Sequence, residues 1–214
     1  MSSKSSRYGL KDQSIEFAES ELESAFRKQD IHSVEYLIYR YIFKHYPMNY
    51  IIPKFPIVLA IEPASKCNLR CKMCFQSNRE FEMSDQSRGI MDLETFYKIF
   101  ENIGDDKVYS IVFASRGEPL VNPNIAQMIS YAKQKGVLDI KLNTNATLLT
   151  PELSRELIRS GLDMIVFSVD SIDEKQYKNI RNTDLKRVLK NINEFLDIKR
   201  TEFANAMIRT RVSM

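Results

Sequence analysis

The sequence predicts an α/β protein whose main domain is a parallel β/α barrel, preceded by an N-terminal helical extension. Two observations lead to this fold class. From residue 57 onward, short apolar runs alternate with longer segments in which apolar residues recur at helical spacing. Cysteines or other polar residues follow four of these runs, and no glycine-rich dinucleotide-binding sequence follows the first. This alternation implies a parallel sheet with right-handed connections, and β/α barrels place their chemistry at the carboxyl ends of the strands.

The N-terminal extension is expected to contain two amphipathic helices, at residues 13–27 and 31–43, because apolar residues recur there with a helical period. The simplest interpretation is a helical pair that packs on the main domain; a dedicated substrate-docking element is the alternative. Pro53 and Pro56 then mark a linker. We therefore expect the extension to cover residues 1–52 and the main domain to cover residues 53–214.

The main domain is expected to contain five strands joined by four helical crossovers. The strands are expected at residues 57–61, 108–114, 140–143, 164–169 and 208–212. The crossover helices are expected at residues 92–104, 125–136, 150–161 and 185–196. Asp92 and Thr150 are favourable N-cap residues, and Gly104, Gly136 and Gly161 stand where the first three helices end.

The composition is that of an ordinary soluble globular protein. The 214 residues are 43% hydrophobic and 28% charged, and the net charge of +3 is too small to indicate binding to nucleic acid or to an anionic membrane. The polar N-terminus does not resemble a signal peptide, and the most apolar stretch, residues 36–43, is too short to span a bilayer. A cytoplasmic location without membrane contact is expected.

The three cysteines of the chain lie within eight residues, Cys67-Asn-Leu-Arg-Cys71-Lys-Met-Cys74. In a reducing compartment such a group indicates metal ligands rather than disulfides. A structural zinc site would need a fourth ligand, and the two histidines, His32 and His45, both belong to the N-terminal extension. Three thiolates this close favour iron–sulfur chemistry, which would leave one iron open to a small molecule, although a zinc-stabilised binding module remains an alternative.

The cysteine spacing C-x3-C-x2-C resembles the signature loop of the radical S-adenosylmethionine (radical SAM) superfamily. The stretch Ser115-Arg-Gly-Glu-Pro-Leu120 resembles that family's Gly-Gly-Glu element after the second strand. Segments that begin at Thr144, Phe167 and Tyr177 resemble those after its third and fourth strands. The resemblance runs from about residue 57 to residue 214, and is closest to the branch with a C-terminal SPASM or twitch domain.

The resemblance implies that Cys67, Cys71 and Cys74 bind a [4Fe–4S] cluster whose open iron binds S-adenosylmethionine. One electron, from a donor such as flavodoxin or ferredoxin, would cleave this cofactor to methionine and a 5′-deoxyadenosyl radical. The radical would abstract hydrogen from a substrate, and a peptide or protein is the leading substrate by analogy alone. A non-catalytic iron–sulfur protein or a degenerate fragment is the alternative.

The resemblance also implies where S-adenosylmethionine binds. Gly117 and Glu118 would receive the methionine ammonium, since glycine permits close backbone approach and the carboxylate offsets the charge. Arg116 stands where the family has its first glycine. Met73 precedes the third cysteine, where the family usually has an aromatic residue, and would pack near the adenine.

Four further residues are expected to line the same site. Ser168 and Asp170 are two apart at a strand end, so we expect both on one side, where they suit ribose hydroxyls. Asn143 would reach cofactor or substrate, and Arg181 would pair with the methionine carboxylate. An ordinary turn or surface position is the alternative for each of them.

The last expected strand and the end of the chain are less determined by the sequence. Arg209 and Arg211 either face the barrel lumen, where they suit an anionic group, or lie solvated on a frayed strand. The family barrel usually has six strands, so the resemblance implies an incomplete barrel of five strands, truncated at the C-terminus. The SPASM or twitch domain, with its auxiliary-cluster cysteines, is expected to be absent.

Overall fold

The computed structural model describes residues 34–83, 89–104 and 106–214. The predicted helix at residues 13–27 lies outside them. The chain forms two compact units, residues 1–57 and residues 58–214, and each is described by itself. The domain boundary at residue 52 remains a prediction. No helix in the described part of the chain is long and apolar enough to cross a membrane.

In the first unit, helix α2 spans Val34–Met48. It covers most of the predicted helix at residues 31–43 and continues for one further turn through polar residues, with Pro47 next to its last position. Aromatic side chains stack along it: the rings of Tyr41 and His45 lie 4.2 Å apart, and Tyr36 meets Tyr39 edge-on at 5.7 Å. Ring contacts between residues one turn apart stabilise a helix in addition to its apolar face. The contact of Tyr41 with His45 therefore helps α2 to continue past residue 43.

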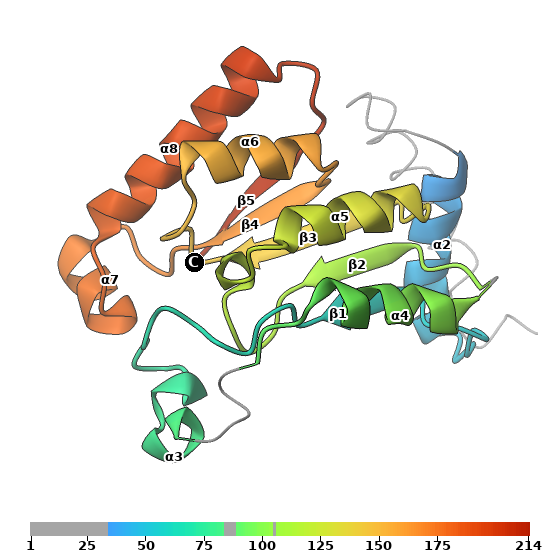
Figure 1. The fold of residues 1–214 in the computed structure, drawn as a ribbon, viewed down its shortest axis with the longest axis horizontal. Helices are drawn as coiled ribbons and strands as arrows, with labels where there is room; N and C mark the ends of the chain where they lie inside the picture. The colour runs from blue at the N-terminus through green and yellow to red at the C-terminus, as the bar shows by residue number, and fades with distance from the viewer. Residues whose placement is uncertain (1–33, 84–88, 105) are drawn as a thin grey trace, which may run out of the picture. The chain divides into compact units, whose positions relative to one another are not determined.

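The second unit contains a five-stranded parallel sheet, as predicted (Figure 1). Its strands are β1 (Val58–Ile61), β2 (Ser110–Phe113), β3 (Asp139–Thr144), β4 (Met164–Ser168) and β5 (Arg209–Ser213). Each strand pairs with its neighbours in the sequence, in the order β1-β2-β3-β4-β5. Because the order never reverses, right-handed crossovers place the connecting helices on one face of the sheet, as in a partial β/α barrel.

The four predicted crossover helices are present and begin where the sequence indicated. They are α4 (Leu93–Ile103), α5 (Ile125–Gln134), α6 (Pro151–Arg159) and α8 (Leu185–Glu202). The side chains of Asp92 and Thr150 accept hydrogen bonds from the backbone N–H groups of Thr95 and Leu153, at 2.7 and 3.2 Å. Gly104, the C-cap of α4, has a positive φ of 61° that favours glycine.

Four shorter elements were not predicted. They are η1 (Phe75–Ser77), α3 (Arg79–Glu82), η3 (Pro119–Val121) and α7 (Glu174–Arg181). Helix α7 matters most for the site, because it lies between the end of β4 and α8 and carries Arg181. Only Tyr177 is buried in α7, so the helix has no apolar period that the sequence could reveal.

The packing between sheet and helices fixes which strand residues face the lumen. Phe113 contacts Phe96 of α4 and Phe167 contacts Phe195 of α8, with ring centroids 6.0 and 5.8 Å apart. Strand residues alternate between faces, so Val166 and Ser168 lie on the opposite, lumenal face. Arg211 pairs in register with Val166 and therefore shares that face.

Arg209, two residues earlier, is on the lumenal face as well and forms an ion pair with Asp139 of β3. The register therefore places both arginines on the lumenal face, as the first interpretation expected, while the side chain of Arg211 is also exposed to solvent, as the second expected.

Candidate functional site

The cysteine loop, residues 62–78, contacts the segments that follow three other strands. The backbone N–H of Glu118 donates to the Lys66 carbonyl (3.1 Å), and the Asn68 amide donates to the Thr147 hydroxyl (2.7 Å). The Lys72 N–H donates to the carbonyl of Ile180 (2.9 Å). The segments after β1, β2, β3 and β4 therefore converge at the carboxyl edge of the sheet.

The three cysteines are free thiols, with Cys71 buried and the other two partly exposed. Burial raises the pKa of both the Cys67 and the Cys71 thiols, and the neighbouring thiols raise that of Cys67 further. Such sulfurs favour the thiolate form only when a cation is near. Within the described residues no three Cys, His, Asp or Glu side chains are already arranged around a metal position.

Arg181 provides a positive charge beside Cys71. Its Nη1 lies 3.9 Å from the Cys71 Sγ, and its backbone carbonyl lies 4.0 Å from the same sulfur. The guanidinium lowers the pKa of the Cys71 thiol and so opposes the larger effect of burial. Arg181 also forms an ion pair with Asp170, so it ties the segment after β4 to the middle of the cysteine loop.

Glu118 is a buried carboxylate that joins the ends of β2 and β3. Its Oε1 accepts from the Thr144 hydroxyl (2.6 Å) and the Leu120 N–H (3.1 Å), and its Oε2 accepts from the Asn145 N–H (2.8 Å). Burial raises the pKa of the Glu118 carboxyl, and these hydrogen bonds oppose the rise. A buried carboxylate close enough to raise the pKa of the Cys67 thiol is well suited to receive a cationic group.

Position 117 needs glycine because the neighbouring backbone leaves no room for a side chain. A Cβ at this position would lie 2.0 Å from the Ala64 carbonyl oxygen and 2.6 Å from that of Lys66. The sequence-based expectation was close approach to a cofactor; in the structure the close approach is to the backbone that leads into the cysteine loop. Any larger residue would push the turn that carries Glu118 away from the loop.

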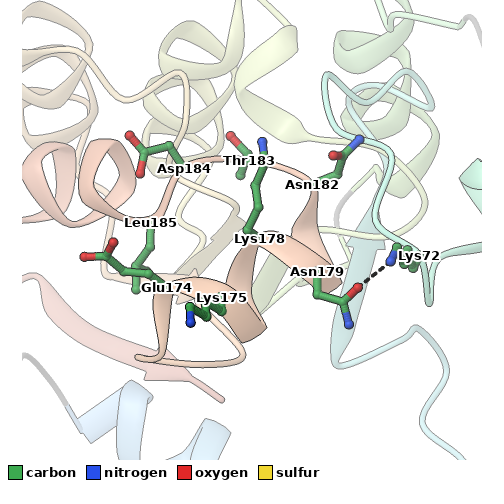
Figure 2. Close-up of a pocket in the computed structure, with 9 residues that line it drawn as sticks. All are labelled: Lys72, Glu174, Lys175, Lys178, Asn179, Asn182, Thr183, Asp184 and Leu185. Atoms are coloured by element: carbon green, nitrogen blue, oxygen red, sulfur yellow. Dashed lines mark hydrogen bonds between the residues drawn. The ribbon is translucent and has the colours of Figure 1, made fainter.

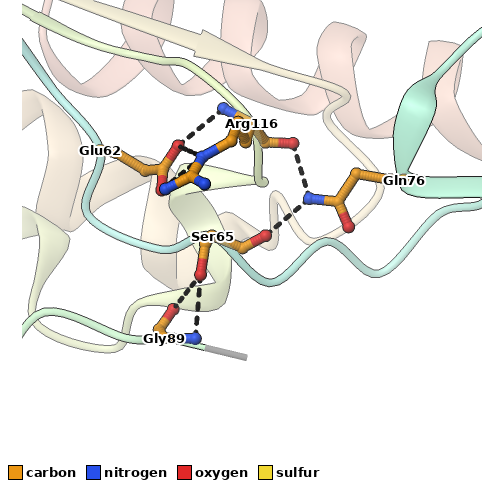
Figure 3. Close-up of polar contacts among 5 residues, drawn as sticks. All are labelled: Glu62, Ser65, Gln76, Gly89 and Arg116. Carbon is orange, nitrogen blue, oxygen red and sulfur yellow. Dashed lines mark hydrogen bonds and ion pairs between the residues drawn. The ribbon is translucent and has the colours of Figure 1, made fainter. Parts of the chain in front are cut away.

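Arg116 fixes this turn from the other side (Figure 3). Its guanidinium binds both oxygens of Glu62, which follows β1, with contacts of 2.7 and 2.9 Å, and its N–H donates to the same carboxylate (2.9 Å). Partial burial acts to raise the pKa of the Glu62 carboxyl, but the bonds from Arg116 hold it below its usual range. The residue that departs from the family's glycine therefore joins the ends of β1 and β2.

Gln76, two residues after the last cysteine, closes the cysteine loop. Its side chain is 1% exposed, and Nε2 donates to the carbonyls of Ser65 (2.6 Å) and Arg116 (2.8 Å) (Figure 3). Ser65 lies two residues before Cys67. One buried amide thus holds both ends of the loop together and ties them to the Arg116 turn.

We expect Gln76→Leu to destabilise the fold by about 1–3 kcal/mol, because it leaves two carbonyls without a donor. Iron incorporation should also fall, since the loop ends lose their common tie. Urea unfolding and iron analysis after reconstitution would measure both effects. Gln134→Leu makes the same change at an exposed position of α5 and should do neither. Equal stability and iron content in the two variants would contradict this role for Gln76.

The remaining predicted residues are Asn143, Ser168, Asp170 and Met73. Asn143 and Ser168 lie on the lumenal face, and the buried Oδ1 of Asn143 has no hydrogen-bond partner among the described residues. Asp170 does not continue the alternation of β4 to share a side with Ser168, as had been expected: the strand ends at Ser168, and Asp170 has a φ of 62°. Met73 is 59% exposed, so most of its side chain is open to solvent.

The resemblance included the segment that begins at Tyr177 but assigned no role to the Tyr177 hydroxyl. Tyr177 is fully buried in α7, four residues before Arg181, and its hydroxyl has no hydrogen-bond partner among the described residues. A buried unpaired polar atom usually has a functional reason. The sequence did not indicate that Tyr177 lies one helical turn from Arg181, because α7 was not predicted.

The donor set fits an iron–sulfur cluster better than zinc. It consists of three sulfurs in one short loop, two of them with raised pKa values, and residues 58–214 contain no histidine. The orphaned Oδ1 of Asn143 on the lumenal face and the carboxylate of Glu118 provide polar groups for a bound small molecule. These residues could therefore hold both a cluster and a cofactor beside it.

Comparison with known proteins gives one family match. The model of the Radical SAM superfamily matches residues 61–208. The chain is 37% identical over 119 residues to the tungsten-containing aldehyde ferredoxin oxidoreductase cofactor-modifying protein of Pyrococcus furiosus, a match that covers 55% of this chain and 32% of that protein. It is 34% identical over 142 residues to the GTP 3′,8-cyclase of Syntrophomonas wolfei, which covers 65% and 42%.

Solved structures share the fold. SuiB of Streptococcus suis bound to the precursor peptide SuiA has a TM-score of 0.60 at 21% identity, over 92% of this chain and 45% of that one. The structure of anSMEcpe with bound AdoMet and the Cp18Cys peptide has a TM-score of 0.56 at 20% identity, over 74% of this chain and 42% of that one. The chain thus spans less than half the length of these relatives.

Proposed function

This chain belongs to the radical SAM superfamily, and from that membership we propose that Cys67, Cys71 and Cys74 bind a [4Fe–4S] cluster and that S-adenosylmethionine binds beside it. One observation carries the proposal: the cysteine loop is hydrogen-bonded directly to the turn that presents the buried Glu118. When bound, the cluster would supply the electron that cleaves S-adenosylmethionine to methionine and a 5′-deoxyadenosyl radical, which takes a hydrogen atom from the substrate.

In this reaction the protein's own residues would hold the cofactor in position. The Glu118 carboxylate would receive the methionine ammonium, and its three hydrogen-bond donors keep it in one orientation. Gly117 keeps this turn against the cysteine loop. Met73 would gain an apolar partner in the adenine, which would cover a side chain that is otherwise exposed.

On the opposite side of the site, Arg181 and Asp170 act as a pair. Arg181 is oriented by the Oδ2 of Asp170 and would bind the methionine carboxylate. The Oδ1 of Asp170 would then accept from a ribose hydroxyl, and the Ser168 hydroxyl would bind the ribose from the lumenal face rather than from the side of Asp170. Asn143, in the lumen below, would donate to or accept from cofactor or substrate, since its Oδ1 is buried without a partner among the described residues.

For the substrate, we propose a peptide or protein side chain. Two structural neighbours, SuiB and anSMEcpe, are known with bound peptides, and this supports the choice by analogy of fold alone. A nucleotide is the second candidate. The relatives named GTP 3′,8-cyclase favour it, and so do the lumenal positions of Arg211 and Lys141, which suit an anionic group.

Anaerobic reconstitution tests the proposed function. The reduced protein should contain iron and sulfide, change its EPR spectrum when S-adenosylmethionine is added, and release 5′-deoxyadenosine. A cluster whose spectrum ignores the cofactor would favour a non-catalytic iron–sulfur protein instead. Zinc without iron or sulfide would favour a zinc-stabilised module. Deuterium transfer into 5′-deoxyadenosine from a labelled peptide or from labelled GTP would separate the two substrate classes.

A further inference from the structure

Helix α7 has an outer face and an inner face. The outer face, together with Lys72 and the start of α8, lines a surface recess, where the Lys72 ammonium donates to the side-chain oxygen of Asn179 (Figure 2). Tyr177 does not line this recess, and none of its surface is exposed. Tyr177 and Arg181 are one helical turn apart, so they share the inner face, from which Arg181 contacts the Cys71 sulfur.

The Tyr177 hydroxyl is an unsatisfied polar group on this inner face. It is buried and has no hydrogen-bond partner among the described residues. Burial raises the pKa of Tyr177, the Arg181 guanidinium lowers it, and the Cys71 sulfur raises it further. Electrostatic effects of this kind weaken with distance, so the hydroxyl belongs to the same group of side chains as the guanidinium and the sulfur. An unpaired buried donor costs free energy that a partner gained on metal binding would return.

Two carboxylates near the hydroxyl already have donors. Asp170 accepts from Arg181, and Asp184 accepts from a backbone N–H of α8 (3.0 Å). Both have a smaller effect on the pKa of Tyr177 than Cys71 has. In the described part of the chain the Cys71 sulfur receives one side-chain donor, the Arg181 Nη1, at a distance of 3.9 Å. The sulfur is therefore the neighbouring acceptor with room for a second donor.

We propose that the Tyr177 hydroxyl donates a hydrogen bond to the Cys71 sulfur when this sulfur binds iron, and thereby raises the reduction potential of the cluster. The inference rests on the proposed function, in which Cys71 is a cluster ligand. A protonated thiol is a weak acceptor, and burial favours that form in the metal-free protein. A thiolate that binds iron carries negative charge and accepts strongly. The hydroxyl therefore has no partner at the thiol and gains one at the thiolate.

This hydrogen bond acts on the electronic properties of the cluster rather than on its attachment. Hydrogen bonds to ligand sulfurs tune the potential of iron–sulfur clusters, because they stabilise the additional negative charge of the reduced form. Arg181 already brings a positive charge to the same sulfur, and Tyr177 adds a neutral donor. The proton stays on the phenol oxygen, and no covalent bond forms or breaks. Tyr177 is thus a positioning residue that acts on the cluster through Cys71.

The test is Tyr177→Phe, which removes the hydroxyl and keeps the ring. In a redox titration followed by EPR, without S-adenosylmethionine, the ratio of reduced to oxidised cluster at a given potential should fall by about threefold to tenfold. This corresponds to a midpoint potential lower by about 30–60 mV, at about 59 mV for each tenfold change. Tyr97→Phe removes a hydroxyl on α4 and should leave the midpoint unchanged. An unchanged midpoint in Tyr177→Phe, or the same shift in both variants, would overturn the inference.

Two further measurements separate this role from a structural one. After reconstitution in heavy water, the electron–nuclear double resonance spectrum of the reduced cluster should contain an exchangeable deuteron signal that weakens in Tyr177→Phe and persists in Tyr97→Phe. The iron-free Tyr177→Phe protein should unfold at the same urea concentration as the original protein or at a higher one, because the hydroxyl has no partner among the described residues to lose. Lower stability of the iron-free variant would identify the hydroxyl as structural and overturn the inference.

Failure of this inference and failure of the proposed function give different results. A cluster whose potential ignores Tyr177→Phe, in a protein that still releases 5′-deoxyadenosine, would overturn the hydrogen bond alone. A change in S-adenosylmethionine affinity without a change in potential would assign the hydroxyl to the cofactor and also overturn the hydrogen bond to Cys71. Reconstitution that yields no iron–sulfur cluster in the original protein would overturn the proposed function, and this inference with it.

Discussion

Replacing Cys71 by alanine is expected to remove the iron–sulfur cluster and to abolish 5′-deoxyadenosine release. Two remaining thiols cannot replace three, because the described residues bring no other thiol or imidazole to the site. The fold should survive the change. Deleting one buried sulfur costs about 1 kcal/mol, and Arg181 keeps its ion pair with Asp170.

Iron and sulfide analysis, EPR and product release would measure this effect, with circular dichroism to show that the variant is folded. Cys67→Ala and Cys74→Ala should cause the same loss, because each would remove one of three equivalent ligands. Ser130→Ala, on α5 away from the loop, deletes one side-chain heteroatom and should change nothing. A Cys71→Ala protein that retains its full iron content would show that the cluster is held in some other way.

The fold was predictable because its signals are local. An apolar run of four to six residues, a helical period and a cap residue can each be recognised within a short window, and the caps at Asp92 and Thr150 form as expected. Helix α7 was not predictable in this way. Its sequence, Glu-Lys-Gln-Tyr-Lys-Asn-Ile-Arg, is polar on nearly every face, and the burial of Tyr177 becomes visible only in three dimensions.

The position of the candidate site was predictable for a different reason. Parallel strands bring all their carboxyl ends to one edge, so the cysteines, Glu118 and Asp170 had to approach one another once the strands were assigned. Their partners were not predictable. Glu62 with Arg116, and Asp170 with Arg181, pair over 54 and 11 residues, and no spacing rule selects such partners from the many charged residues of the chain.

Arg116 is an example of a residue whose partners the sequence does not reveal, at the position where the family's Gly-Gly-Glu element has its first glycine. From the sequence, arginine in place of glycine was a departure of unknown consequence. In the structure its guanidinium and N–H bind Glu62, and its carbonyl accepts from Gln76. The same residue therefore joins the end of β1, the end of β2 and the far end of the cysteine loop.

Replacing Glu118 by glutamine is expected to weaken S-adenosylmethionine binding by about tenfold to a hundredfold. The substitution keeps the shape of the side chain and removes the charge proposed to receive the methionine ammonium, and a hydrogen bond to a charged group contributes about 1.5–3 kcal/mol. The cofactor-induced change in the EPR spectrum, titrated with S-adenosylmethionine, would measure this. Thr144→Val is the matched control, because it removes one donor to Glu118 but keeps the charge, and it should bind far better. Equal binding by Glu118→Gln and the original protein would contradict the assignment.

The same substitution has a pH signature in the metal-free protein. Burial raises the pKa of Glu118 in the folded state. Its contribution to stability is therefore fully present below the pKa of an unfolded glutamate, about 4.3, and is lost as pH rises through the folded-state pKa. Glutamine is neutral at every pH and shows no such loss. Its amide NH2 group would face a donor such as the Asn145 N–H, and this unpaired donor costs about 1–3 kcal/mol of folding stability at every pH. The stability deficit of Glu118→Gln in urea unfolding should therefore shrink between pH 4.5 and pH 7.5. A deficit that grows over this range would mean that the carboxylate is held ionised by its three donors despite its burial.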